Sequence, residues 1–258
     1  MTSRAWCLLL AVFLGLIHTS GASFAEEPPR EAWTGSSTVG EVVARRPATA
    51  RIFELVGIDY CCGGETTLTA AAEAAGVDPV RLLAALAVVG QGASSTAESD
   101  WTRKSSREIV KHILDTHHAF LRRELPRIAH MAARAARVHG EQHPEIREID
   151  TAFQALSREL MDHLALEEEH VFPALLRLGE GVRADDATAA RLATLDQDHA
   201  RAGEVLHKLR KLAADYVAPE WACPLVRELF RALQAFEQDM HRHVHLENSV
   251  LLPRHLPR

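Results

Sequence analysis

The sequence predicts an all-α protein in which a small helical domain precedes an antiparallel four-helix bundle. Apolar residues recur at alternating steps of three and four over four long segments, which is the pattern of a helix that buries one face. Short connections containing Gly, Pro or Asp separate these segments, and such connections make neighbouring helices antiparallel. All but one of the 15 histidines lie at or after His112, so the front and back of the chain differ in chemistry.

We expect four parts along the chain: a leader over 1–35, the small helical domain over 36–90, a linker over 91–104 and the bundle over 105–258. The linker is assigned because residues 91–100 (QGASSTAESD) are small and polar. The 258 residues suffice for two domains with apolar cores. A formal charge of −6 leaves no basic surface typical of nucleic-acid binding, so no nucleic-acid partner is expected.

The first 25 residues have the layout of a secretory signal. Arg4 precedes an apolar run over 6–17, and small residues follow up to Ala25. The apolar run is too short for a membrane-spanning helix. Export is one interpretation, and a start site placed too far upstream is the other.

Capping residues delimit the helices of the small domain. The motif Thr38-Val39-Gly40-Glu41 is typical of a capping box and begins a helix that ends before Pro47. Gly57 and Gly76 are suited to end two further helices, and Asp78 with Pro79 begins the last one. The predicted helices therefore begin near 38, 48, 67 and 78.

Cys61 and Cys62 lie in a glycine-flanked loop of this domain. Adjacent Cα atoms are about 3.8 Å apart, which is shorter than the usual disulfide span. The pair therefore favours metal capture or thiol redox chemistry in a reducing compartment, and we assign Cys61 and Cys62 as candidate cofactor-binding residues. The alternative is that the two side chains only shape the loop.

The bundle helices are predicted over 106–138, 144–177, 186–216 and 224–252. Six polar residues stand on their apolar faces, where core side chains are expected. His163 and Glu167 are four residues apart, as are His243 and Glu247, so each pair shares one helix face. Counting 1.5 Å per residue from the helix ends puts all six at one level of the bundle. The six residues are His118, His163, Glu167, His199, His243 and Glu247.

Burying several imidazoles and two carboxylates together costs many kcal/mol unless another charge compensates them. A pair of metal ions provides that charge, and imidazole with carboxylate suits iron, manganese or zinc. We expect the two glutamates to bridge two ions and two histidines to serve as terminal ligands of each ion. An oxide or hydroxide bridge and an open position for a small ligand complete this dinuclear site. The alternative is that one or two of these histidines are satisfied core residues.

Several motifs resemble the iron–sulfur cluster repair di-iron proteins, which join a small Cys-Cys domain to a hemerythrin-like domain. These are GIDYCCGG at 57–64, HAFLRRELP at 118–126, RVH at 137–139, HLALEEEHVFP at 163–173, Asp198-His199, and HVHLENSVLLPR at 243–254. The resemblance extends over about 38–254. The sequence departs from the family at Leu252, where phenylalanine is usual, and in its leader.

The resemblance implies that the six residues named above bind two iron ions joined by an oxo or hydroxo bridge. It implies repair of clusters damaged by oxidative or nitrosative stress, by supply of iron, rather than conventional enzyme activity. Damaged iron–sulfur proteins would be the clients, and nitric oxide or oxygen would be small ligands, with nitric-oxide reduction as an associated activity. The family is cytoplasmic, and a homodimer is left open.

Two other functions remain alternatives. A hemerythrin-type protein that binds or senses oxygen or nitric oxide would more typically have His-x-x-x-His where this sequence has His243-x-x-x-Glu247. A ferritin-type oxidase would need Glu-x-x-His motifs on the buried faces, and these are missing. Of the other histidines, His117, His241 and His245 are expected to be solvated or to lie behind the metal ligands.

Overall fold

The computed structural model describes residues 33–92, 100–181 and 186–255. The described residues are helical apart from turns and one isolated β-bridge between Thr38 and Thr67, so the predicted all-α class is confirmed. The predicted signal and most of the leader lie outside the described residues, as do linker residues 93–99. None of the described helices is both long enough and apolar enough to cross a membrane.

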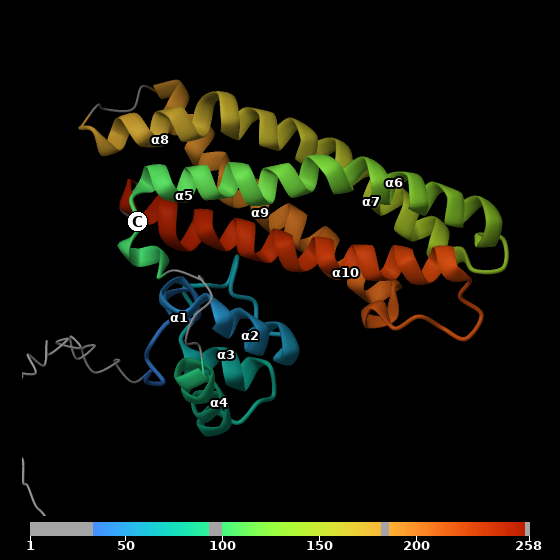
Figure 1. The fold of residues 1–258 in the computed structure, drawn as a ribbon, viewed down its shortest axis with the longest axis horizontal. Helices are drawn as coiled ribbons and strands as arrows, with labels where there is room; N and C mark the ends of the chain where they lie inside the picture. The colour runs from blue at the N-terminus through green and yellow to red at the C-terminus, as the bar shows by residue number, and fades with distance from the viewer. Residues whose placement is uncertain (1–32, 93–99, 182–185, 256–258) are drawn as a thin grey trace, which may run out of the picture. The chain divides into compact units, whose positions relative to one another are not determined.

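The small domain contains four α-helices and one 3₁₀ turn. They are α1 (Val39–Arg45), η1 (Pro47–Thr49), α2 (Ala50–Val56), α3 (Leu68–Ala74) and α4 (Pro79–Gly92) (Figure 1). Thr38 caps α1 by accepting a hydrogen bond from the Glu41 backbone N–H at 3.3 Å. Gly57 ends α2 in the left-handed conformation, with φ of 74°. Phe53, Tyr60 and Leu68 lie in the core of this domain.

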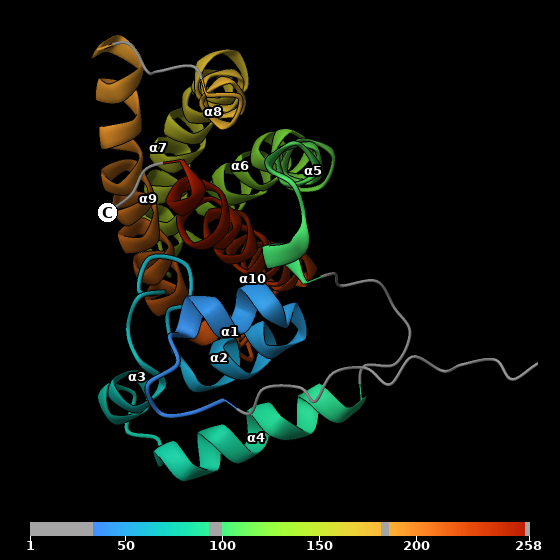
Figure 2. The same cartoon turned by 90° about the vertical axis from the view of Figure 1, so that its left-hand side faces the viewer.

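Four long helical segments form the bundle, close to the predicted ranges (Figures 1 and 2). The first contains α5 (Ser106–His112), η3 (Ile113–His118) and α6 (Ala119–His139), and the second α7 (Pro144–Leu166), η4 (Glu167–Val171) and α8 (Phe172–Gly179). The third contains α9 (Asp186–Leu212) and the 3₁₀ turn η5 (Ala214–Tyr216). The fourth contains α10 (Pro224–His245), η6 (Leu246–Leu251) and η7 (Leu252–Arg254). Helix α6 packs against α7 and α10, and α9 also packs against α7 and α10.

Three of these segments contain a π-helical turn, at η3, η4 and η6. Two of the segments also contain a proline, Pro126 or Pro173, and a proline inside a helix removes a backbone donor. Helix α6 is continuous across Pro126 because this proline is exposed, so water can satisfy the carbonyl that loses its donor. Pro173 follows η4 near the start of α8, where a missing N–H is tolerated.

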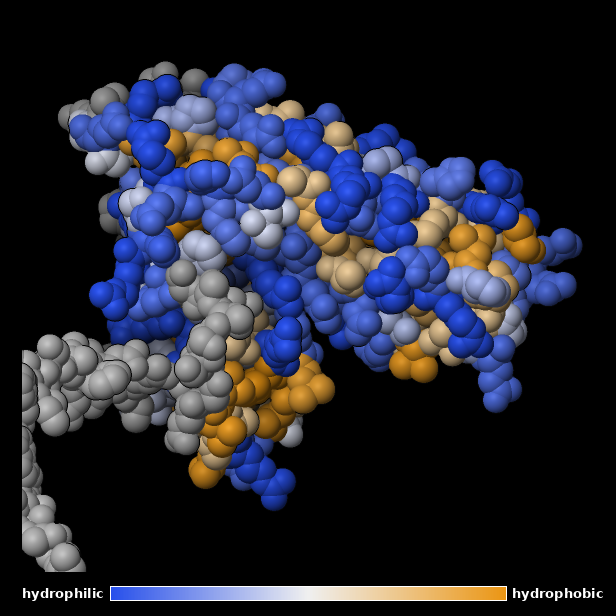
Figure 3. Space-filling view, viewed as in Figure 1, coloured by the Kyte–Doolittle hydropathy of each residue, from blue (hydrophilic) through white to orange (hydrophobic). Residues whose placement is uncertain are grey.

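Two apolar clusters fill the bundle. The larger cluster includes Leu121, Phe153 and Phe236, whose two aromatic rings meet edge to face at 5.3 Å. The second cluster includes Ile113 and Phe172. Outside these cores, Leu55, Val80 and Val88 of the small domain are exposed. Figure 3 shows apolar surface on the visible face of this domain.

The small domain contacts the bundle through a close approach of Gly40 and Gly64 to Ser249. A Cβ atom at Gly40 would lie 2.7 Å from the Ser249 Oγ and 3.0 Å from the Gly64 carbonyl oxygen. A Cβ at Gly64 would also lie 2.7 Å from the Ser249 Oγ. A side chain at Gly40 would therefore crowd both Ser249 and the Gly64 backbone, which is already in hydrogen-bonding contact, with the Gly40 N–H donating to the Gly64 carbonyl at 2.8 Å.

We predict that Gly40→Ala lowers the free energy of unfolding by about 1–3 kcal/mol, because the added methyl overpacks a buried contact. Urea denaturation of the purified variant measures this change. Gly203→Ala is the matched control, since its Cβ would lie 3.7 Å from the Cys62 Sγ, an ordinary contact, within helix α9. Gly203→Ala should be neutral or slightly stabilising. Equal stability of Gly40→Ala and the wild type would contradict the close approach.

Candidate metal centre

Six polar side chains meet in the bundle where one apolar cluster gives way to the other. They are the residues predicted from the sequence: His118, His163, Glu167, His199, His243 and Glu247. We call them the His–Glu cluster. On each of the four helical segments, residues of one apolar cluster precede these positions and residues of the other follow them. The cluster is therefore a polar layer enclosed at both ends by packed hydrocarbon.

The cluster contains two sets of four donors that share both glutamates. One set is His118, His243 and the glutamates, and the other is His163, His199 and the glutamates; within each set the donor atoms lie within 4.8 Å of one another. The Nε2 atoms of His118 and His243 are 3.2 Å apart, as are those of His163 and His199. Two ligand atoms bound at right angles about 2.1 Å from one ion lie about 3 Å apart. Each histidine pair therefore has the spacing of neighbouring ligands on a single ion.

Both glutamates face both histidine pairs. Glu167 places Oε2 3.4 Å from the His118 Nε2 and Oε1 3.1 Å from the His163 Nε2. Glu247 places Oε1 3.0 Å from the His243 Nε2 and Oε2 3.1 Å from the His199 Nε2. One oxygen of each carboxylate is thus directed to each pair, which is the arrangement of a carboxylate that bridges two ions.

The carboxylate oxygens are buried without adequate hydrogen bonds. Glu167 and Glu247 are 1% and 2% exposed. Both oxygens of Glu167 and Oε2 of Glu247 have no hydrogen-bond partner among the described residues. An unsatisfied buried carboxylate is costly, so a cation between these oxygens and the imidazoles fits the donor set.

The charges of the cluster are mutually dependent. Burial alone would raise the pKa of Glu167, but the imidazoles of His163, His118 and His199 hold that pKa well below its usual range. Glu247 likewise has its pKa lowered to about 2: the imidazoles of His243 and His199 outweigh burial and the neighbouring Glu167, both of which raise it. Burial lowers the pKa of His199, but the two carboxylates raise it well above its usual value.

Polar partners orient two of the four imidazoles through their Nδ1 atoms. The Nδ1 of His118 lies 2.8 Å from the Glu168 Oε1, and the Nδ1 of His199 lies 2.9 Å from the Asn248 Oδ1. Such contacts leave Nε2 free for a metal and fix the ring. The Nδ1 of His163 is 3.9 Å from the Asp198 Oδ2, which is too far for a hydrogen bond. The Nδ1 of His243 has no hydrogen-bond partner among the described residues.

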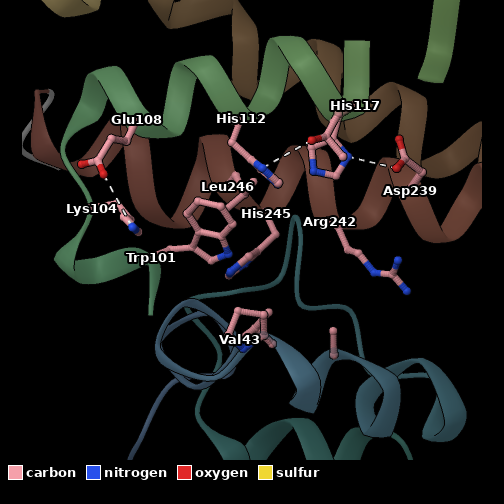
Figure 4. A pocket seen from close by; sticks show the side chains of 13 residues that line it. Val43, Trp101, Lys104, Glu108, His112, His117, Asp239, Arg242, His245 and Leu246 are labelled. Carbon is pink, nitrogen blue, oxygen red and sulfur yellow. Dashed lines mark hydrogen bonds and ion pairs between the residues drawn. The ribbon is translucent and has the colours of Figure 1, made fainter. Parts of the chain in front are cut away.

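A pocket of about 430 Å³ lies behind His243. Figure 4 shows His117 in this pocket, with its Nδ1 3.0 Å from the Asp239 Oδ1. The His117 ring stacks on the His243 ring, with centroids 5.6 Å apart and an interplanar angle of 10°. Asp239 Oδ2 and His245 Nε2 are buried without a hydrogen-bond partner among the described residues. The pocket therefore extends to within one imidazole of the His–Glu cluster.

Of the other histidines considered in the sequence, two lie deeper than a solvated position allows, and His241 is half-buried. His117 and His245 are buried, and the His245 Nδ1 donates to the Tyr60 carbonyl at 3.2 Å. Burial lowers the pKa of His245 to about 4, so this imidazole is neutral. His139 instead lies at the end of α6, with its Nε2 3.2 Å from the Cys223 Sγ.

The loop 59–62, which we call the thiol loop, lies against the bundle beside the His–Glu cluster. The Cys62 Sγ is 3.9 Å from the His199 carbonyl oxygen, and the Asn248 amide donates to the Cys61 carbonyl at 3.4 Å. Both cysteines are free thiols. The hydrogen bond from the Cys61 thiol lowers the pKa of Cys62, and the same bond, with burial, raises the pKa of Cys61 well above its usual value.

Asn248 and Asp239 were not identified from the sequence. Asn248 follows Glu247 and is the one buried uncharged polar residue of a turn in which Leu246, Val250 and Leu251 are also buried. A buried amide requires hydrogen-bond partners, so this position was a usable signal. Asp239 carried no such signal, because its partner His117 is 122 residues away in the sequence.

The fold and the cluster define a metal-binding four-helix bundle of the hemerythrin type. Residues 110–254 match the family described as the hemerythrin HHE cation binding domain, and residues 35–89 match a domain of unknown function, DUF542. The chain therefore belongs to the hemerythrin HHE family and, with its DUF542 domain, to the family of iron–sulfur cluster repair proteins, as the sequence resemblance predicted.

Proteins named for iron–sulfur cluster repair are similar to this chain over nearly the whole of their own lengths. The iron-sulfur cluster repair protein ScdA of Staphylococcus haemolyticus is 30% identical over 218 residues, which cover 84% of this chain and 97% of that protein. The protein of the same name from Staphylococcus epidermidis is 30% identical over 86% of this chain and 98% of its own. The iron-sulfur cluster repair protein YtfE of Yersinia pseudotuberculosis is 29% identical over 86% of this chain and 97% of its own.

Proposed function

We propose that this protein binds two iron ions in the His–Glu cluster and repairs iron–sulfur clusters damaged by oxidative or nitrosative stress by supplying iron to them. The observation that carries the proposal is that each of two buried glutamates faces both histidine pairs. The relatives that match both domains are named for iron–sulfur cluster repair, which supports this function over oxygen carriage or sensing.

Each residue of the cluster has a defined part in this function. His118 and His243 would hold one iron ion, His163 and His199 the other, and Glu167 and Glu247 would bridge the two. Glu168 and Asn248 orient the imidazoles of His118 and His199. When bound, the iron would supply a transferable metal ion and a redox-active centre able to bind nitric oxide.

Proton binding favours release of the iron. Burial lowers the pKa of His163 and of His199, but the carboxylates raise both above the ordinary value in the metal-free state. These imidazoles therefore take up protons when iron leaves, and the two carboxylates keep charged partners. Because metal and proton compete for the same nitrogens, iron affinity falls as pH falls.

Small ligands have a polar route towards the cluster. The pocket lined by His112, His117 and Asp239 (Figure 4) comes within one imidazole of the proposed metal-binding residue His243, because His117 stacks on the His243 ring. We propose nitric oxide or oxygen as its occupants. We also propose that the protein works in a reducing compartment such as the cytoplasm, because the thiols of Cys61 and Cys62 are free.

Iron loading followed by a repair assay tests the proposal. Protein loaded anaerobically with iron(II) and then oxidised should contain about two iron ions per chain, the number the two donor sets can hold, and show the near-ultraviolet absorption of oxo-bridged ferric ions. The loaded protein should reactivate a nitric-oxide-damaged [4Fe–4S] hydratase better than the same concentration of free iron(II). Saturation at one iron, preference for zinc, or reactivation no better than free iron would refute it.

A further inference from the structure

The thiol loop contains a set of metal donors separate from the His–Glu cluster. Donor atoms of Asp59, Cys61 and Cys62 lie within 4.8 Å of one another. We propose that these three residues form a second metal site, which binds a single divalent ion, iron(II) in the protein's working state. That iron passes through this site on its way out of the His–Glu cluster is a further part of the inference, and this part rests on the proposed function.

The sulfur geometry suits an ion better than a disulfide. The two Sγ atoms are 3.5 Å apart, whereas a disulfide bond is about 2.05 Å long. Two thiolates bound about 2.3 Å from one tetrahedral ion lie about 3.8 Å apart. The spacing of Cys61 and Cys62 is therefore close to that of two ligands on one ion.

Backbone hydrogen bonds hold the carboxylate beside the thiols. Asp59 Oδ1 accepts from the backbone N–H groups of Cys61 at 2.9 Å and of Cys62 at 3.0 Å. Asp59 Oδ2 makes neither of these bonds and is the oxygen we assign to the metal. Thiolate and carboxylate together suit a borderline ion such as iron(II) or zinc(II).

Access to the loop comes from a second pocket, of about 530 Å³. Cys61, Cys62 and Glu65 line this pocket together with Asn248 and Ser249. Cys62 is exposed, so an ion bound here would keep at least one position for water or for a ligand of a client protein. Binding releases one proton from each thiol to water and leaves three anionic donors around a divalent ion.

The same loop touches the element that holds the His–Glu cluster. Asn248 contacts the ring of His199 through its Oδ1 and the carbonyl of Cys61 through its Nδ2. The Cys62 Sγ also lies against the His199 backbone. The thiols therefore lie on the backbone and Nδ1 side of His199, one imidazole away from the Nε2 atom that faces the His–Glu cluster.

Cobalt(II) titration of the full-length, metal-free protein tests the site. Sulfur ligands give cobalt(II) an intense near-ultraviolet charge-transfer absorption, whereas imidazole and carboxylate do not. The wild type should show this absorption with the intensity of one thiolate-bound ion per chain. Cys61→Ser and Cys62→Ser should lose it, and Asp59→Asn should weaken the affinity about tenfold. Cys223→Ser, which removes a free thiol outside the loop, is the matched control and should retain it.

Absence of the absorption in the wild type, its persistence in both loop variants, or its loss in Cys223→Ser would overturn the site. Circular dichroism of each variant establishes that it is folded. The same titration in Glu167→Leu, which lacks one bridge of the His–Glu cluster, should still give the thiolate absorption. The Glu167→Leu variant separates the second metal site from the proposed di-iron site. If the second site exists, the absorption persists in this variant even when the His–Glu cluster holds no iron pair.

Passage of iron is tested by its release from the reduced, iron-loaded protein to an excess of a coloured chelator. Cys62→Ser should release iron at least about fivefold more slowly than Cys223→Ser, because the adjacent donor is missing. Equal release rates would overturn the transit role while leaving the cobalt(II) site in place.

Discussion

Glu167→Leu is expected to lose nearly all bound iron. The two oxygens of Glu167 face different histidine pairs, so one substitution removes a ligand from both ions. Iron per chain should fall at least about tenfold, because both ions lose a direct ligand. Colorimetric iron determination and the near-ultraviolet spectrum measure the loss.

The fold of Glu167→Leu should survive. Leucine suits a position between two apolar clusters, and the substitution removes a buried charge, which is often neutral or stabilising in the metal-free protein. His118→Leu should retain more iron, because His118 belongs to one donor set only. Glu169→Leu, at an exposed position of the same turn, is the control and should bind iron normally. Iron content equal to wild type in Glu167→Leu would eliminate the bridging role.

Asn248→Leu should weaken iron binding about 10–100-fold, the usual effect of losing the group that orients a metal-binding histidine. The Asn248 amide accepts from His199 and donates to the thiol loop, and leucine does neither. Competition with a chelator of known affinity measures the iron affinity, and the rate of Cys62 alkylation reports the position of the loop. Alkylation should be faster in the variant because the loop has lost its anchor.

Asn248→Asp separates the two contacts. Aspartate keeps an oxygen acceptor for His199 but has no N–H to donate to the Cys61 carbonyl. It should therefore retain iron more strongly than Asn248→Leu while showing the same faster alkylation of Cys62. Wild-type iron affinity in Asn248→Leu would show that the ring of His199 needs no such support.

The helical segments were predictable because the side chains that a helix buries recur in the sequence at steps of three and four residues. The apolar stripes continue through His118, His163 and His199, which made these polar residues conspicuous and led to the site. Capping residues such as Thr38 and Gly57 located helix ends for the same local reason. A pattern confined to one helix can be read without knowledge of its neighbours.

Contacts between segments that are far apart in the sequence produce no such periodic pattern. The thiol loop meets α9 across 137 residues of sequence, and it is held there by contacts such as the packing of Gly40 and Gly64 against Ser249 and the hydrogen bond from Asn248 to the Cys61 carbonyl. The π-helical turns were also hidden, because one additional residue in a turn changes neither composition nor hydropathy. The donors of the His–Glu cluster were therefore predictable from the sequence, whereas the backbone conformation that positions them was not.

The π-helical turns η3, η4 and η6 contain His118, Glu167 and Glu247. Each holds one more residue per turn than an α-helix, and such turns concentrate at functional sites. If the extra residue of such a turn moved to the adjacent turn of the same helix, the metal-binding side chain between them would rotate by about 100°, the angle between successive residues of a 3.6-residue turn. That movement exchanges one backbone hydrogen bond for another and unfolds nothing. On the proposed function, each of these turns would be a point at which one ligand could leave its iron ion while the helices of the bundle stay folded.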